Sequence, residues 1–492
     1  MGWMDLFRVA RPEVAALHKT WTAFFLTFFV WFNMAPLATT IARAASLTEA
    51  QLKLLAICNV ALTVPARIFI GMASDRFGPR RTFAMLMILS AIPCLAFAIG
   101  SSYTQLLISR LVLSSVGAGF VIGIHMTSLW FKPKDIGFAE GVEAGLGNWG
   151  SSIAAMTLPS LALGLFGGAN GWRYSIALSA VVMALYGVYY WFGITDGPAE
   201  SAHRRPRKAA AIEVSSWGDL GSAILWTVPI MGVLAILVWR VSGMGFMGTK
   251  AALVAYGVIA VGVVYQMVQL LRVNVPILRK GVPADDRYRF TDVACLCSTY
   301  VANFGAELAV VSMLPAFFEK TFHMSPQWAG LIGAQFAFLN FFSRALGGYV
   351  SDRMTSRRKN LLVYMAGIAA SFVLMGFINS AWPVALAVFA TWICAMFVTG
   401  GCGATFAMIP LVKRRITGQV AGYAGAWGNV GATVFLTVYT FVSDSQFFFV
   451  LGGTALVSFV FCVLSLKEPK GAFAETYQLS SVDREIELGQ AA

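Results

Sequence analysis

Residues 65–81 read PARIFIGMASDRFGPRR, an apolar helical pattern that contains one arginine and ends in a basic turn. A second copy of the pattern, SRALGGYVSDRMTSRR, covers residues 343–358. In each copy an arginine, Arg67 or Arg344, stands eight residues before the aspartate of a Ser-Asp-Arg triplet. Eight helical residues rise about 12 Å, so both arginines are expected near mid-bilayer if each triplet marks the membrane surface. A charge at that depth is costly and indicates a functional site.

The overall composition predicts a membrane protein. Hydrophobic residues make up 58% of the 492 residues and charged residues 12%, whereas a soluble domain is about one quarter charged. The apolar segments are about 20 residues long, which is the length of a spanning helix rather than of a barrel strand. The formal net charge of +13 comes from basic residues clustered in short turns. Such clusters reflect membrane topology, so we predict a lipid bilayer and no nucleic acid as partner.

The chain carries no sequence motif of covalent or metal catalysis. Its seven cysteines fall within apolar segments, where they are expected to pack as small hydrophobic residues. Asp75 and Asp352 stand beside arginines in turns, an unsuitable setting for a general acid–base pair. We therefore predict no enzyme activity, no cofactor and no metal site.

The apolar segments predict an all-α membrane protein made of two six-helix halves. The twelve core helices are joined by an extra central hairpin, which gives fourteen helices in total. The hairpin either spans the membrane or lies in its interface; the length of its two segments favours spanning. Corresponding motifs in the second and eighth spans are typical of a two-fold pseudosymmetric transporter. The expected segments are a polar N-terminal stretch (1–19), the first half (20–194), a linker (195–289) that contains the hairpin (221–271), the second half (290–466) and a loose polar tail (467–492).

The distribution of lysine and arginine predicts the orientation. The loops with Arg76, with the run RRPRK at 204–208 and with Arg353 all lie on one side of the predicted membrane, together with both termini. Loops rich in lysine and arginine remain in the cytoplasm. We expect a cell-membrane protein with both termini cytoplasmic.

Two glycine-rich stretches, AGLGNWG at 144–150 and AGAWGNVG at 424–431, occupy corresponding places in the fifth and eleventh core spans. Asn148 and Asn429 each lie fourteen residues after a basic loop residue, a rise of about 21 Å into the membrane. Helix packing through small residues would explain the glycines, but it would not explain an asparagine twice in register. The motif glycines are Gly145, Gly147, Gly150, Gly425, Gly428 and Gly431.

The turn from Gly71 to Arg81 resembles the loop between the second and third helices of the major facilitator superfamily. This resemblance implies a gating element with Asp75, Arg76 and Arg80 in the first half. The second copy, with Asp352 and Arg353, departs from the pattern because Thr355 replaces the turn glycine. The carboxylates are expected to accept charge-assisted hydrogen bonds from cationic neighbours and to latch the two halves together.

More specifically, the chain resembles the nitrate/nitrite porter family (NarK-type) of that superfamily. The two Gly-Asn-x-Gly stretches resemble its nitrate motifs, and Arg67 and Arg344 match its pair of membrane-embedded arginines. Phe120, Tyr300 and Phe304 match its aromatic positions. The resemblance implies transport of nitrate and nitrite by alternating access, with the aromatic rings packed around the anion and Asn148 and Asn429 among its ligands.

The chemistry of the arginines fits this resemblance. Nitrate is planar, singly charged and weakly hydrated, and a guanidinium is a planar, weakly hydrated, permanently charged donor fork. Two opposed arginines would leave an empty site with an excess of positive charge. The alternative for either arginine is an ion pair with a buried carboxylate.

Glu307, in FGAEL at 304–308, lies seven residues beyond Tyr300 and so on the same helix face. This segment resembles the high-affinity nitrate-transporter branch of the family. Glu307 could take up a coupling proton, or it could be a static partner of an arginine; both readings stay open. Glu140 and Glu143 are expected to be solvated at the cytoplasmic end rather than to act in gating, and His125 to be a packing residue rather than a proton relay.

Two other functions stay open at this point. One is facilitated transport of a small organic anion such as a carboxylate, and the other is a nitrate receptor without transport. The sequence also does not decide between proton symport and nitrate/nitrite exchange.

Overall fold

The computed structural model describes residues 1–198, 210–243 and 245–487. The basic run at 204–208, which contributed to the predicted orientation, lies outside these residues. The described residues form helices and connecting turns without a β-strand. The prediction of an all-α fold is confirmed.

The first half contains the following elements: η1 (Trp3–Phe7), α1 (Pro12–Trp31), η2 (Ala35–Leu37), α2 (Ala38–Ala44), α3 (Glu49–Ala61), α4 (Thr63–Phe77), α5 (Pro79–Ile99), α6 (Tyr103–Leu113), η3 (Ser114–Ala118), α7 (Gly119–Trp130), η4 (Pro133–Asp135), α8 (Ile136–Ser160), η5 (Leu161–Leu165) and α9 (Gly171–Gly193).

The linker contains α10 (Trp217–Gly243), α11 (Thr249–Lys280) and η6 (Ala284–Asp286). The second half and the tail contain α12 (Phe290–Tyr300), η7 (Val301–Gly305), α13 (Ala306–Phe322), α14 (Pro326–Phe338), α15 (Asn340–Arg353), α16 (Arg357–Gly376), α17 (Val384–Phe406), α18 (Ile409–Val412), η8 (Arg414–Ile416), α19 (Thr417–Tyr439), α20 (Asp444–Ser465) and α21 (Ser481–Glu487).

Eleven helical segments of the described chain are long and apolar enough to cross a membrane. Three further stretches, namely α8, the α14–α15 pair and α19, are not among the eleven. All three carry the glycine, asparagine or arginine motifs, and polar and small residues lower the hydropathy of a helix. The total of fourteen spanning helices therefore stays a prediction.

Several long helices are interrupted close to the motif residues. A break at Leu62 separates α3 from α4, five residues before Arg67, and a break at Leu339 separates α14 from α15, five residues before Arg344. Between α12 and α13 the chain forms a π-helical turn, η7, directly after Tyr300. π-Turns are rare and frequently mark functional sites. Both halves thus interrupt their helices near the middle of the bundle.

The two halves meet along two long seams, α4 against α19 and α8 against α15. Glycines make this approach possible. A Cβ at Gly71 would overlap the backbone of Gly418, and a Cβ at Gly348 would overlap the backbone of Gly137. The repeated glycine in the two copies of the opening motif therefore brings each helix against the opposite half.

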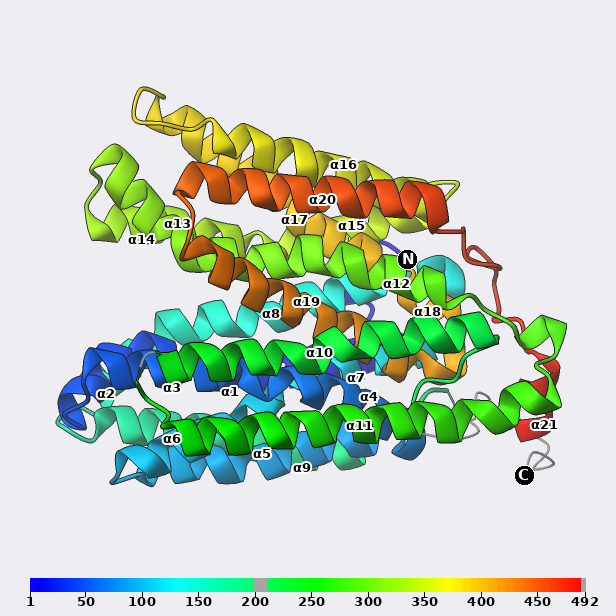
Figure 1. The fold of residues 1–492 in the computed structure, drawn as a ribbon, viewed down its shortest axis with the longest axis horizontal. Coiled ribbons are helices and arrows are strands. Elements are labelled where there is room, and N and C mark those ends of the chain that lie inside the picture. Colours follow the sequence, from blue (N-terminus) through cyan, green and yellow to red (C-terminus); the bar gives the residue numbers. More distant parts are fainter. Residues whose placement is uncertain (199–209, 244, 488–492) are drawn as a thin grey trace.

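The central hairpin runs alongside the core, with α10 and α11 nearly parallel to the other long helices (Figure 1). Both helices are among the eleven segments that could cross a membrane, which favours spanning over an interfacial position. Helix α10 contacts α3 and α4 of the first half and α12 and α19 of the second. The hydroxyl oxygens of Thr227 and Tyr423 lie 2.5 Å apart, and the rings of Trp226 and Trp427 lie 4.7 Å apart.

The N-terminus and helix α21 lie at one end of the bundle (Figure 1), which we call the basic end because Arg76, Lys134, Arg353 and Arg415 lie there. The expectation of a loose tail is wrong for residues 467–487. Glu468 accepts hydrogen bonds from the backbone of Arg357 and Arg358 at 2.9 Å each, at the start of α16.

Farther along, the tail contacts the first half and the loop before α19. Glu475 pairs with Lys132 and Lys134, and these ammonium groups hold the pKa of Glu475 below its usual value, against the small effect of burial. Asp483 pairs with Arg415 at 3.0 Å. The tail is ordered because its spaced carboxylates meet the basic loops.

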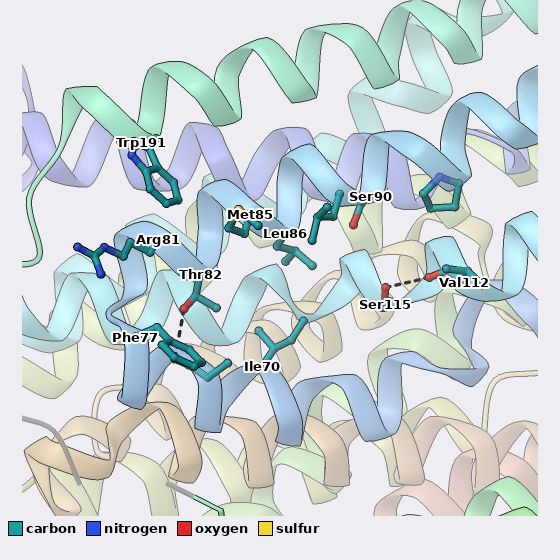
Figure 2. A pocket seen from close by; sticks show the side chains of 13 residues that line it. Ile70, Phe77, Arg81, Thr82, Met85, Leu86, Ser90, Val112, Ser115 and Trp191 are labelled. Carbon is teal, nitrogen blue, oxygen red and sulfur yellow. Dashed lines mark hydrogen bonds between the residues drawn. The ribbon is translucent and has the colours of Figure 1, made fainter.

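A cavity of about 530 Å³ lies on the side of the first half, between α4, α5, α6 and α9 (Figure 2). Apolar side chains such as Ile70, Met85 and Leu86 form most of its lining. The polar Thr82 is occupied by hydrogen bonds to backbone oxygens of α4 and of the turn after it. Arg81 is the one charged residue of this mostly apolar lining, which includes neither Arg67 nor Arg344.

Candidate anion-binding site

The three aromatic residues singled out from the sequence form one cluster between the halves. Tyr300 stacks between Phe120 and Phe304, with ring centroids 6.1 and 4.9 Å away and interplanar angles of 3°. A fourth ring, Phe406, packs edge-on against Phe120 at 4.6 Å and Tyr300 at 4.8 Å. All four rings are buried. The cluster joins α7 of one half to η7, α12 and α17 of the other.

Arg67 enters this cluster from α4 and is 0% exposed. Its guanidinium carbon lies 5.5 Å from the Phe120 ring centre and 5.3 Å from that of Phe304. Its Nη1 donates to the Gly425 carbonyl at 2.8 Å and its Nε to the Gly117 carbonyl at 3.4 Å. Arg67 thus binds the backbone of both halves.

Arg67 keeps a hydrogen-bond donor that a ligand could use. Its Nη2 and the Tyr300 hydroxyl are both buried and have no hydrogen-bond partner within the described part of the chain. With the Asn429 amide oxygen turned toward the guanidinium, it accepts from Nη1 at 3.1 Å and from Nε at 3.3 Å. A buried cation with an unused donor is a costly arrangement unless a ligand completes it.

Arg344 enters from α15 and is 1% exposed. Its Nη2 pairs with Glu307 Oε2 at 2.9 Å, and its Nε donates to Asn340 Oδ1 at 2.6 Å. Asn340 in turn donates to Glu307 Oε1 at 2.6 Å. The three side chains form a closed triad next to the aromatic cluster, since the guanidinium carbon of Arg344 lies 5.5 Å from the Phe304 ring centre.

The triad changes the expected charge of the site. The sequence suggested two uncompensated arginines, with an ion pair to a buried carboxylate as the alternative for either. The contact between Glu307 and Arg344 realises that alternative for one of them. Two guanidinium groups and one carboxylate leave a net charge of +1. A buried site with one excess positive charge is neutralised by one monovalent anion, and a second anionic charge would be left unpaired.

The two motif asparagines are not equivalent in the structure. Asn429 lies against Arg67, as described above. Asn148 donates to the Ala144 carbonyl of its own helix at 2.7 Å. In its other amide orientation Asn429 likewise donates to the carbonyl four residues earlier, that of Gly425 at 3.3 Å. The difference between the two amides is therefore the Arg67 guanidinium that faces Asn429.

The motif glycines lie where helices or rings approach closely. A Cβ at Gly428 would stand 2.6 Å from a ring carbon of Tyr300, and one at Gly425 would stand 3.1 Å from Arg67 Cδ. The remaining four glycines face neighbouring helices: Gly145 faces Asn340, Gly147 faces Phe24, Gly150 faces Phe25 and Gly431 faces Val301. Side chains at these positions would displace the site residues or separate the helices.

A comparison with known families identifies this architecture. The sequence description of the Major Facilitator Superfamily matches residues 20–277 and 296–480. The chain belongs to the Major Facilitator Superfamily. The superfamily predicted from the basic turn and its second copy is confirmed.

Individual relatives narrow the comparison within the superfamily. The "Nitrate/nitrite transporter NrtP" of Nostoc punctiforme is 42% identical over 469 residues, which cover 94% of each chain. The "High affinity nitrate transporter 2.5" of Arabidopsis thaliana is 28% identical, and the aligned region covers 90% of this chain and 76% of that transporter. These relatives confirm the predicted resemblance to the nitrate/nitrite porter family.

A solved structure of a double-tryptophan mutant of XylE superposes with a TM-score of 0.62. The superposed region covers 97% of this chain and 98% of the XylE chain, at 13% sequence identity. At this identity the likeness concerns the superfamily fold alone.

The superfamily turn closes the basic end in a way that the sequence did not indicate. Asp75 accepts hydrogen bonds from the backbone N–H groups of Gly418 and Gln419, both at 2.8 Å, at the start of α19. Asp352 does the same at the start of α8, with Gly137 at 2.9 Å and Phe138 at 2.6 Å. Each carboxylate therefore joins its own half to a helix N-terminus of the other half.

The arginines of the superfamily turn, Arg76, Arg80 and Arg353, make few of the contacts that were expected of them at this closure. Arg76 and Arg353 stack on Phe77 and Tyr349 of their own helices, at 5.3 Å each. The Arg80 backbone N–H donates to Asp196 at 2.7 Å. Asp352 does pair with Arg357 at 2.7 Å. The expected bond from a cationic neighbour is present for Asp352, and Arg357 also donates to the Pro133 carbonyl of the first half at 2.6 Å. The interhalf bonds described for the two carboxylates come from helix N-termini.

The expected solvation of Glu140 and Glu143 is also wrong. Both side chains are 0% exposed in α8, because α8 is covered by α1, α7 and α15. His125 Nδ1 lies 2.8 Å from Ser74 Oγ and 3.4 Å from Asp75 Oδ1, which agrees with a packing role.

Sequence reasoning missed two residues of the site, Phe406 and Asn340. Phe406 ends α17 and has no motif around it. Asn340 stands one helical turn before Arg344, a spacing that puts two side chains on one face. That spacing could have indicated Asn340.

Proposed function

We propose that this protein transports nitrate, and also nitrite, across the cell membrane by alternating access. The observation that carries this proposal is the buried Arg67 guanidinium, which lacks a carboxylate partner among the described residues. Its Nη2 and the buried Tyr300 hydroxyl of the same cluster both have no hydrogen-bond partner among those residues. A planar monovalent anion fits a planar donor fork between aromatic rings, and it restores neutrality. The 42% identical relative that spans nearly the whole chain is a nitrate/nitrite transporter.

In this proposal Arg67 holds the charge of the anion, and Arg344 stays within reach across Phe304. The rings of Phe120, Tyr300 and Phe304 exclude water. Asn429 supports Arg67, while Asn148 becomes a ligand when α8 moves. The six motif glycines let α8 and α19 slide against their neighbours as the halves, 20–194 and 290–466, rock about the site.

The basic end faces the cytoplasm in this proposal, so that both termini are cytoplasmic. The carboxylates Asp75 and Asp352 hold the cytoplasmic gate closed. Loops rich in lysine and arginine stay on that side of a membrane, and nitrate then enters the cell from the opposite end.

The experiment is uptake of isotopically labelled nitrate by proteoliposomes that contain the purified chain. Unlabelled nitrite or chlorate should compete with the label, and small carboxylates should not. Inhibition by carboxylates would favour the organic-anion function. Binding of nitrate without any flux would favour a receptor instead.

We further propose that nitrate entry is coupled to protons and that Glu307 takes part. A proton on Glu307 would remove the charge that holds Arg344, so the anion could engage both guanidinium groups. The alternative is nitrate/nitrite exchange, in which the ion pair between Glu307 and Arg344 stays fixed.

Glu307→Gln should abolish nitrate accumulation driven by a pH gradient, because an amide cannot bind and release the proton. Exchange of external nitrate for internal nitrite should continue. Both fluxes are measured in the same proteoliposomes. The control is Glu319→Gln, an exposed glutamate of the same helix α13. Unimpaired accumulation by Glu307→Gln would leave Glu307 as a static partner of Arg344.

A further inference from the structure

Helix α8 contains two carboxylates that the proposed nitrate site does not use. Glu140 and Glu143 lie about one helical turn apart and are both 0% exposed. All four of their carboxylate oxygens lack a hydrogen-bond partner within the described residues. Buried carboxylates normally have a donor or a counter-ion.

The space around these carboxylates contains a further unpartnered group. A Cβ at Gly123 of α7 would overlap a carboxylate oxygen of Glu143, so the carboxylate lies directly on α7. Four residues farther along α7, the hydroxyl of Thr127 is buried and likewise has no partner among the described residues. Since α7 and α8 run antiparallel through a short turn, Thr127 lies at the level of Glu140.

The charged and titratable groups around the pair come from several elements. Glu143 is within electrostatic range of Arg344 on α15 and of Tyr190 on α9. Glu140 is within range of Glu143 and of Tyr477 in the tail. The two glutamates therefore form a path from the central arginines toward the basic end.

Other titratable groups on the neighbouring helices have partners of their own. On α7, His125 contacts Ser74 and Asp75. On α1, His18 bonds to the Leu6 carbonyl at 2.9 Å and Lys19 to the Gly193 carbonyl at 2.5 Å. None of these interactions supplies a donor to the Glu140 and Glu143 oxygens.

We propose that Glu143, with Glu140 beside it, is a proton-binding site that couples proton movement to nitrate transport. This inference rests on the proposed nitrate transport and places the coupling proton on α8, so that Glu307 keeps its charge as the partner of Arg344. An ionised carboxylate without a donor costs several kcal/mol in a closed, dry site, whereas a neutral carboxyl group avoids most of that cost. The proton binds one Glu143 oxygen when the outer side opens, and it leaves to water when the basic end opens.

The charge balance explains why the proton and nitrate would move together. With Glu307 ionised in its pair with Arg344 and with Glu140 protonated, Arg67, Arg344 and Glu307 sum to +1. Bound nitrate then makes the closed centre neutral only if Glu143 carries a proton. Without nitrate, the centre is neutral only if Glu143 is ionised. Nitrate alone or a proton alone leaves one buried net charge, which opposes closure.

The test uses the full chain in proteoliposomes and the variant Glu143→Gln. The first measurement is nitrate counterflow without a pH gradient, and the second is accumulation driven by an acidic exterior. The variant should retain counterflow and lose at least about tenfold of the gradient-driven accumulation. Glu143→Asp, which keeps an ionisable group, should recover accumulation, and Glu319→Gln is the exposed control.

A second measurement applies even if Glu143→Gln does not transport. Nitrate added to weakly buffered, solubilised protein should cause uptake of about one proton per bound nitrate, reported by an indicator dye. Glu143→Gln should bind nitrate without this uptake.

Gradient-driven accumulation or proton uptake by Glu143→Gln at the wild-type level would overturn the inference. A wild type that shows nitrate counterflow but no accumulation in a pH gradient would also overturn it and would leave nitrate transport standing. Absence of nitrate counterflow in the wild type would refute the proposed function, and this inference with it.

Discussion

Replacing Arg67 by lysine should lower the rate of nitrate uptake at low nitrate concentration about a hundredfold, at unchanged protein in the membrane. A lysine keeps the charge but loses the planar donor fork. The loss of one or two charge-assisted hydrogen bonds to the anion corresponds to about 3 kcal/mol, or roughly two factors of ten. Initial uptake rates over a range of nitrate concentrations measure the effect.

The comparison variant is Arg344→Lys, which should also nearly abolish uptake. The reason differs, because Arg344 already binds Glu307 and Asn340, and lysine would break the triad as well as the donor fork. Arg43→Lys, at the exposed end of α2, should leave uptake unchanged. Normal uptake by Arg67→Lys would contradict the assignment of Arg67 as the anion's charge partner.

Replacing Asp75 by asparagine should shift the protein toward a state that is open at the basic end. The carboxylate accepts from two N–H groups at the start of α19, and an amide can accept only through its oxygen while losing the charge. Loss of such a helix N-terminal interaction costs about 1–2 kcal/mol, which raises the open population roughly five- to thirtyfold.

Distances between spin labels at positions 81 and 359, measured by pulsed electron paramagnetic resonance, report this opening. Both positions are exposed and belong to different halves, and all seven native cysteines are buried. Asp352→Asn should have a smaller effect if Arg357 stabilises the remaining contacts. Asp444→Asn, at the first residue of a helix at the other end, is the control. An unchanged distance distribution in Asp75→Asn would contradict the proposed latch.

Arg67 and Arg344 show which structural features a repeated sequence motif predicts and which it does not. Their equal spacing to Asp75 and Asp352 correctly indicated corresponding helices in two halves. The same spacing suggested two equivalent cations, and this part is wrong, since Glu307 binds Arg344 only. The partner comes from another helix, thirty-seven residues away from Arg344 in the chain.

The sequence by itself determined the fold class and the superfamily, and it singled out two arginines and three of the four rings that the structure brings together. Those properties depend on local spacing, on hydropathy and on motifs that stand within one helix. Only the tertiary structure decided the +1 charge of the site, the contact of Asn429 with Arg67, the helix N-termini that meet Asp75 and Asp352, and the burial of Glu140 and Glu143. Each of these depends on which side chain a neighbouring helix presents at the same depth, and helix packing brings together residues that no spacing along the chain relates.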